Sequence, residues 1–355
     1  MSKVILSALL FAAIVLPGTS QATSAVVQAS CVAADDLAAG DILYNKGLAY
    51  HKQNQEEKAL EVYAQALALY EKIGNQPYAA DTLYNMGTSN HAIGQEEKAR
   101  ELYDRALAIY KRVDQQKSVA DVLESIGTSY QASALHDKAV EYYNLAQPIY
   151  EKLGNQSGIG DSLYNIGWSY HKLKQDDKAL ELEKRAIAIY EKLNNQSYVG
   201  DTLNNMGLSY KALGQTDKAL ESYDRAMGIY QKLDNQKGIA DVLQNMGLIF
   251  HSQKQEDKAL DHYDRALAIY RKLNRQAGIA DSLYNMGLSY YALDQQDKAL
   301  DSNTRALAIY ENLNNQPYVA DTCENLSLVY RKLSQEEKYK EYHARAQAIR
   351  NQLGK

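Results

Sequence analysis

Aspartate and asparagine side chains recur in this chain at intervals of 40 residues, and most of the aspartates have an asparagine four positions later. The aspartates are Asp41, Asp81, Asp121, Asp161, Asp201, Asp241, Asp281 and Asp321. The asparagines are Asn45, Asn85, Asn165, Asn205, Asn245, Asn285 and Asn325. Because an amide donates and accepts hydrogen bonds at once, a column of asparagines is suited to both groups of an extended peptide backbone. The neighbouring carboxylates would favour a partner that carries Lys or Arg.

Aromatic side chains accompany these columns and are candidate anchors for a bound segment. The chain contains 29 Tyr but only 2 Phe and 1 Trp. Tyr packs its ring like Phe and keeps a polar tip for a partner, and Trp and Tyr dominate interface hot spots. The candidate anchors are Tyr44, Tyr84, Tyr164, Trp168 and Tyr284. A second aromatic column is predicted to be core: Tyr70, Tyr110, Tyr150, Tyr190, Tyr230, Tyr270 and Tyr310.

The polar columns also have a purely structural interpretation, in which Asp and Asn tie adjacent repeats together by hydrogen bonds. For a single residue the sequence does not separate the two interpretations. For the face as a whole, binding is favoured because repeat proteins use their concave surface.

Four histidines share one position of the repeat: His51, His91, His171 and His251. A zinc site needs three or four ligands at about 2.1 Å, and only the first two of these histidines stand in consecutive repeats. We therefore predict solvated histidines and no bound metal. The sequence has no GxxxxGK, GxSxG, HExxH or CxxC motif, so we predict a protein that is not an enzyme and has no cofactor.

Charge and hydropathy narrow the classes of partner. The formal net charge is -5, and no basic stripe is present that would neutralise a phosphate backbone, which argues against nucleic acid. No basic amphipathic segment suited to a membrane surface is present either.

The N-terminus has the features of a secretory signal peptide over residues 1–22. Lys3 precedes an apolar run over residues 4–16, and the small residues Ser20 and Ala22 fit a cleavage site. The alternative, an uncleaved anchor, is disfavoured because the run has 13 residues whereas a spanning helix needs about 20. We therefore expect an exported protein, periplasmic or secreted, without membrane insertion after cleavage. Residues 23–35 would be a linker to the repeats.

The fixed period without insertions predicts an all-α solenoid of eight two-helix repeats over residues 36–355. In the second repeat, apolar spacing predicts a first helix over residues 77–93 and a second helix from about residue 96. Gly87 would allow the two helices to approach within about 8–10 Å. Cys31 and Cys323 are predicted not to pair, because they lie near opposite ends of the solenoid, which do not meet.

The pattern of one repeat resembles the tetratricopeptide repeat, in its extended form found in Pins-type scaffolds and bacterial signalling proteins. The matching residues of the fifth repeat are Leu203, Met206, Gly207, Tyr210, Ala219, Tyr223 and Ala226. The resemblance covers about residues 32–355 and implies a right-handed superhelix whose first helices line a concave face. In the Pins-type family a similar asparagine column holds the ligand peptide.

Several repeats depart from this pattern. The eighth carries Ser327, Tyr339, His343 and Arg350 at signature positions, so its outer helix is predicted to be a polar cap. Pro148 lies inside the second helix of the third repeat and predicts a bend. Glu183 and Asn303 replace a signature tyrosine, and nothing in the sequence explains either change.

These features together predict a non-catalytic scaffold that binds a protein or peptide segment in the concave groove. Two alternatives stay open, a regulatory subunit of an envelope enzyme or signalling complex and a glycan-binding protein. The groove is predicted to use Asp41, Asn45, Asp81, Tyr84, Asn85, Asp161, Tyr164, Asn165, Trp168, Asp201, Asn205, Asp241, Asn245, Asp281, Tyr284, Asn285 and Asn325.

Overall fold

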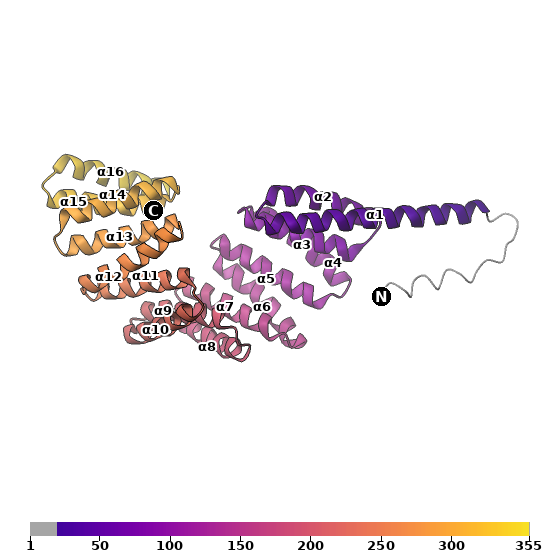
Figure 1. The fold of residues 1–355 in the computed structure, drawn as a ribbon, viewed down its shortest axis with the longest axis horizontal. Helices are drawn as coiled ribbons and strands as arrows, with labels where there is room; N and C mark the ends of the chain where they lie inside the picture. The colour runs from indigo at the N-terminus through magenta and orange to yellow at the C-terminus, as the bar shows by residue number, and fades with distance from the viewer. Residues whose placement is uncertain (1–19, 355) are drawn as a thin grey trace. The chain divides into compact units, whose positions relative to one another are not determined.

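The computed structural model describes residues 20–354, which form sixteen α-helices and no β-strand (Figure 1). The N-terminal unit, which ends at Leu153, contains α1 (Ser20–Lys52), α2 (Glu56–Lys72), α3 (Gln76–Ala92), α4 (Glu96–Arg112), α5 (Gln116–Ala132) and α6 (His136–Leu153). The C-terminal unit, which begins at Gly154, contains α7 (Gln156–Lys172), α8 (Asp176–Lys192), α9 (Gln196–Ala212), α10 (Thr216–Lys232), α11 (Gln236–Ser252), α12 (Glu256–Lys272), α13 (Gln276–Ala292), α14 (Gln296–Asn312), α15 (Gln316–Lys332) and α16 (Glu336–Gln352).

The predicted all-α fold with eight two-helix repeats is confirmed. The first helix of the second repeat, predicted over residues 77–93, is α3 over Gln76–Ala92. Most of the predicted signal peptide, residues 1–19, lies outside the described residues. Residues 23–35, expected to be a linker, belong to the 33-residue helix α1.

The turns between repeats follow from local side-chain chemistry. Asn194 has a φ of 53°, a left-handed conformation that ends α8 after Leu193. The next residue, Asn195, caps α9, because its side-chain oxygen accepts a hydrogen bond from the backbone N–H of Tyr198 at 3.4 Å. One residue thus stops a helix and its neighbour starts the next, which keeps the period constant.

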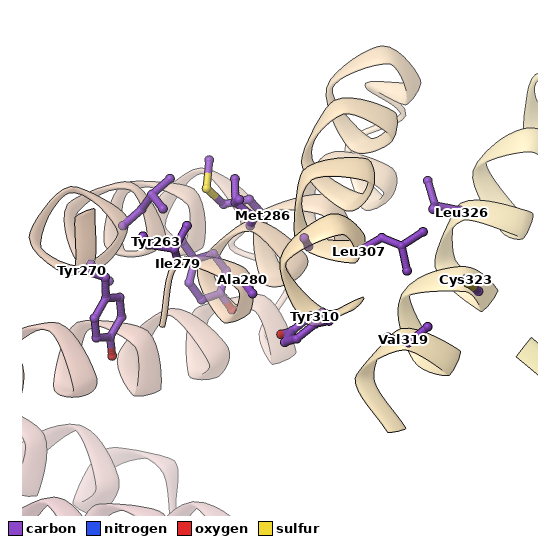
Figure 2. Packing of buried hydrophobic residues seen from close by; sticks show 14 of the residues in the cluster. Tyr263, Tyr270, Ile279, Ala280, Met286, Leu307, Tyr310, Val319, Cys323 and Leu326 are labelled. Carbon is purple, nitrogen blue, oxygen red and sulfur yellow. The ribbon is translucent and has the colours of Figure 1, made fainter. Parts of the chain in front are cut away.

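Within a repeat, the two helices close over a glycine. A Cβ added to Gly207 on α9 would lie 2.3 Å from Cε1 of Tyr223 on α10, and Tyr223 is fully buried. The glycine therefore provides the space into which the tyrosine ring packs. Figure 2 shows the apolar packing of the C-terminal unit, where Tyr263, Tyr270 and Tyr310 belong to the same buried cluster.

The predicted core column is confirmed, since every tyrosine in it is buried. Cys323 occupies a leucine position of the repeat and is fully buried, as expected of a small hydrophobe. Helix α6 continues through Pro148 without interruption. The last helix, α16, buries only Ala346 among its residues.

Successive first helices contact each other in both units: α1, α3 and α5 in one, and α7, α9, α11, α13 and α15 in the other. No two successive second helices do so within the described residues. The first helices therefore form the inner surface of each unit. We call this surface the first-helix face, and it carries all the residues predicted for binding.

The glycine–tyrosine contact gives a stability prediction with an internal control. Gly207→Ala should destabilise the protein by about 1–3 kcal/mol, because its Cβ overlaps a buried ring. Gly228→Ala, on helix α10 with nothing within 4 Å of the new Cβ, should stabilise it by about 0.5–1 kcal/mol. Urea unfolding of both variants measures the difference, and equal effects would contradict the packing described here.

Candidate functional site

Each aspartate of the first-helix face accepts a hydrogen bond from the core tyrosine of its own repeat. The Oη–Oδ1 distances lie between 2.5 and 3.0 Å in the first seven repeats. In the eighth repeat Arg350 replaces the tyrosine, and its guanidinium pairs with Asp321 at 3.1 Å. Burial raises the pKa of Tyr190 and of its partner Asp161, so the phenol keeps its proton and remains the donor. The aspartates thus tie the two helices of a repeat together.

The second carboxylate oxygen differs among the repeats. Lys117 and Lys237 donate to Oδ2 of Asp121 and Asp241, each at 2.6 Å. No such lysine stands beside Asp201 or Asp281. The aspartate column therefore combines carboxylates that the chain itself neutralises with others that it leaves uncompensated.

The asparagine column joins adjacent first helices in part. Nδ2 of Asn85 on α3 donates to the Tyr44 hydroxyl on α1 at 2.8 Å. Nδ2 of Asn245 on α11 likewise donates to Asn204 on α9 at 3.0 Å. Asn205 and Asn285 are only 6% and 8% exposed. These four amides therefore have a structural role, whereas Asn45 is exposed and bonds only within its own helix.

Two hollows bring predicted residues together. The hollow of the N-terminal unit has a volume of about 320 Å³ and includes the predicted Asp81, Tyr84 and Asn85 in its lining. The hollow of the C-terminal unit measures about 460 Å³ and lies between the predicted Asp241 and Asp281. The other predicted residues of this unit lie along the same face, on α7, α9, α11, α13 and α15: Asp161, Tyr164, Asn165, Trp168, Asp201, Asn205, Asn245, Tyr284, Asn285 and Asn325.

An apolar stripe on this face was not predicted from the sequence. It consists of half-buried side chains at one repeat position of the C-terminal unit: Trp168, Leu208, Leu248, Leu288 and Leu328. The sequence signal was present, because these residues recur with the same 40-residue period as the polar columns. The ammonium of Lys172 lies 4.3 Å from the centre of the Trp168 ring, so a cation already covers part of this anchor.

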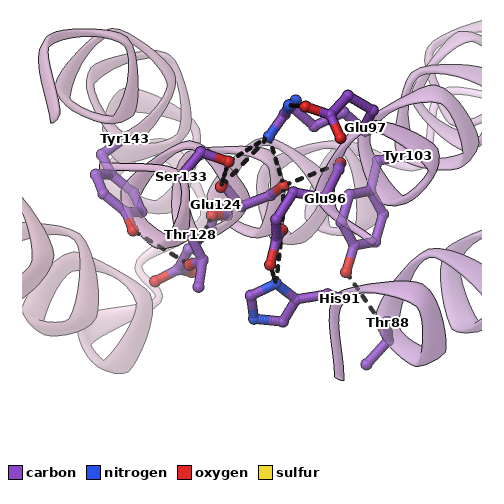
Figure 3. Close-up of polar contacts among 11 residues, drawn as sticks. Thr88, His91, Glu96, Glu97, Tyr103, Glu124, Thr128, Ser133 and Tyr143 are labelled. Carbon is purple, nitrogen blue, oxygen red and sulfur yellow. Dashed lines mark hydrogen bonds and ion pairs between the residues drawn. The ribbon is translucent and has the colours of Figure 1, made fainter. Parts of the chain in front are cut away.

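A threonine at the stripe position lies within reach of the buried tyrosine hydroxyl below it, although Tyr143 also donates to Gln131 at 2.6 Å. Where this residue is Thr88 or Thr128, its hydroxyl lies 3.4 or 3.2 Å from that of Tyr103 or Tyr143 (Figure 3). Where the residue is leucine, three equivalent tyrosine hydroxyls have no hydrogen-bond partner among the described residues: Tyr63, Tyr223 and Tyr263. Leucine at this position therefore leaves a buried donor unpaired.

The prediction of solvated histidines is wrong. Nδ1 of His51, His91 and His251 bonds a glutamate five residues later, at 2.8–2.9 Å, and His171 bonds Asp176 at 2.6 Å. Figure 3 shows the pair of His91 and Glu96. Each pair spans the turn between the two helices of one repeat. The sequence contained the signal for these pairs. In all four repeats that have the histidine, the residue five positions later is Glu or Asp.

Glu183 is a buried carboxyl that has no place in the repeat pattern. It is fully buried where other repeats have a tyrosine, and neither oxygen has a hydrogen-bond partner among the described residues. Burial is the main cause that raises its pKa to about 8, and the nearby Asp176 raises it further. The carboxyl is therefore protonated over much of the neutral range.

Residues 20–354 contain no group of three or more His, Cys, Asp or Glu side chains arranged to hold a metal ion. Within the same residues no helix is both long and apolar enough to cross a membrane.

Comparison with known families identifies the repeat. A tetratricopeptide-repeat profile matches residues 38–112, 118–192 and 198–272, and a second one matches residues 281–316. These matches cover more than half of the chain, which belongs to the tetratricopeptide-repeat family. No curated protein matches the sequence at a significant level.

Solved structures share the fold at low sequence identity. The apo form of RapI is 16% identical, with a TM-score of 0.67, over 78% of this chain and 99% of that chain. A STAND signal-transduction ATPase from Pyrococcus horikoshii with a tetratricopeptide repeat sensor is 15% identical, with a TM-score of 0.67, over 88% and 48%. A Rap protein complexed with competence and sporulation factor is 20% identical, with a TM-score of 0.57, over 77% and 75%.

The buried Glu183 makes stability depend on pH. Because the carboxyl holds its proton up to a pKa of about 8 in the fold but only to 4.5 otherwise, native stability should fall as pH rises between these values and level off above them. Glu183→Gln removes this loss. The free energy of unfolding of Glu183→Gln should exceed that of the parent only slightly near pH 4.5 and by about 2–4 kcal/mol at pH 8.

Urea unfolding across this pH range measures this difference. The same substitution at Glu181, exposed on the same helix, controls for the loss of one negative charge. A constant difference between Glu183→Gln and the parent would contradict the assignment.

Proposed function

We propose that this protein is a non-catalytic scaffold that binds a peptide or protein segment on the first-helix face. The single observation that carries the proposal is the apolar stripe of Trp168, Leu208, Leu248, Leu288 and Leu328 on that face. An unpaired buried hydroxyl costs about 1–3 kcal/mol, and in the second repeat the threonine at the stripe position gives the Tyr103 hydroxyl a partner. Leu208 and Leu248 leave the hydroxyls of Tyr223 and Tyr263 unpaired and present apolar surface to a partner instead.

The charges beside the stripe support a partner with basic side chains. Asp201 and Asp281 each use one carboxylate oxygen to accept from a tyrosine, and no lysine of the repeat compensates the other oxygen. Such carboxylates attract Lys or Arg and set the orientation of a bound segment. Apolar contact would then provide affinity, while the carboxylates provide specificity.

The comparisons agree with recognition of a polypeptide. A Rap protein of related fold has been solved in complex with competence and sporulation factor. Family membership and the repeat fold favour binding rather than catalysis. If residues 1–22 act as a signal peptide, the partner is met outside the cytoplasm.

Substitution on the stripe tests the proposal. Leu208→Ser with Leu248→Ser should weaken capture of bound proteins from envelope extract at least about tenfold, because it removes apolar contact area. The matched control is Leu233→Ser with Leu273→Ser, two exposed leucines that end second helices. Quantitative mass spectrometry of proteins captured on the immobilised mature chain measures the effect. Equal capture by the two double variants would refute binding on the first-helix face.

A further inference from the structure

The first-helix face carries a row of equivalent notches, one between each two consecutive aspartates of a unit. The floor of a notch is the core tyrosine that donates to the first aspartate, and the second aspartate forms the far wall. The residue three positions before the second aspartate stands over the floor. This covering residue differs from repeat to repeat, and it decides whether the notch is filled or open.

In three notches the covering residue is a tyrosine, whose ring stacks on the floor. Tyr78 lies on Tyr70 with ring centres 5.2 Å apart and planes at 19°. Tyr198 on Tyr190 gives 4.8 Å and 26°, and Tyr318 on Tyr310 gives 4.9 Å and 21°. Each covering ring is 38–42% exposed, so one of its faces meets the floor and the other remains accessible.

The charges around a filled notch confirm where the covering ring lies. Burial raises the pKa of Tyr318, and the carboxylates of Asp281 and Asp321 raise it further. Its phenol therefore lies within reach of both walls. The covering tyrosine occupies the space between two consecutive aspartates.

In the other three notches the covering residue is small: Ser118, Gly238 over Tyr230, and Gly278. At Ser118 and Gly278 the same space is hollow. Ser118 covers Tyr110 between Asp81 and Asp121, and these four residues line the 320 Å³ hollow of the N-terminal unit. Gly278 covers Tyr270 between Asp241 and Asp281, and these four line the 460 Å³ hollow of the C-terminal unit. Two hollows found in different units are thus one repeat position left unfilled.

We propose that each open notch takes an aromatic side chain of the bound polypeptide, which stacks on Tyr110 or Tyr270 as the chain's own tyrosines do elsewhere. This inference rests on the proposed function, that the first-helix face binds a polypeptide. The ligand class follows from internal precedent, because every large covering side chain among these six notches is a tyrosine. Aromatic rings also favour offset stacking on an aromatic floor.

One acidic wall of each open notch is already neutralised by the chain itself, which weakens selection of a cation there. Lys117 neutralises Asp121 at 2.6 Å in one notch, and Lys237 neutralises Asp241 at 2.6 Å in the other. Arg275 also lines the second hollow, beside Tyr270. Each open notch therefore offers a stacking surface in which one of the two acidic walls is neutralised by a lysine.

A fluorinated tyrosine amide, N-acetyl-meta-fluorotyrosinamide, tests the proposal with the full chain. Fluorine NMR line broadening reports the bound fraction. Closing the notches with Ser118→Tyr and Gly278→Tyr should reduce the bound fraction about twofold or more. Opening two filled notches with Tyr198→Ser and Tyr318→Ser should raise it. N-acetylargininamide and N-acetylleucinamide are the unlabelled competitors, and neither should displace the probe.

Several results would overturn the proposal. A bound fraction that is the same in the closed, parent and opened proteins would show that the notches take no aromatic ring. Displacement by the arginine amide would show that they select cations. Because a Cβ at residue 278 would lie 2.6 Å from the Tyr270 ring, circular dichroism must first establish that the closed variant is folded. If the closed variant is not folded, the comparison of the opened variant with the parent protein decides the question.

Failure of this inference is distinguishable from failure of the proposed function. If capture of proteins depends on Leu208 and Leu248 but the amide probe does not respond to the notch variants, the face binds polypeptides without aromatic insertion, and only the inference fails. If capture is independent of the stripe, the proposed function fails, and with it the basis of the inference.

Discussion

The hydrogen bond from a buried tyrosine to the aspartate 29 residues before it in the chain organises every repeat except the last. Burying a phenol without a partner costs about 1–3 kcal/mol, and here the carboxylate across the two helices of the repeat is that partner. This single bond fixes the register of the second helix on the first. It also holds the tyrosine ring flat beneath the first-helix face, where the ring becomes the floor of a notch. The same bond that stabilises the repeat therefore creates the surface that a ligand would meet.

Other positions of the repeat are less constrained by its geometry, and the residue type at these positions differs between repeats. Opposite the stripe the tyrosine hydroxyl is satisfied by Thr88 and Thr128 but is unpaired in the repeats of Leu208 and Leu248. At Glu183 a protonated carboxyl replaces the ring altogether. Each of these departures gives up stability on or directly below the same face. On this face, positions that lose stability point to function, whether or not they follow the period.

The sequence was sufficient for the fold, because a 40-residue period without insertions places equivalent side chains in equivalent positions. It was also sufficient to group Asp81, Tyr84 and Asn85, which line one hollow. It did not separate binding from structural roles, because Asn45 and Asn85 have the same sequence pattern, but only Asn85 bonds a neighbouring first helix. The pairing of His91 with Glu96 across a turn was visible in the spacing but depends on the turn geometry. Whether a notch is open or filled depends on how the aromatic rings stack, and residue spacing in the sequence does not reveal this.

A period of 120 residues is superposed on the 40-residue period, so that consecutive repeats differ in the side chains they place on the first-helix face. Tyr78, Tyr198 and Tyr318 recur every 120 residues, and Lys117 and Lys237 share the same interval. The filled notches and the lysine-neutralised aspartates therefore alternate in a fixed order along the chain. In a perfectly regular solenoid every register of a bound segment would be equivalent, since each repeat would present the same groups. A three-repeat alternation of filled notches, neutralised carboxylates and uncompensated carboxylates removes that degeneracy, because a segment shifted by one repeat meets a different set of partners. The variation between repeats would thus allow an array of similar units to bind the proposed segment in one register.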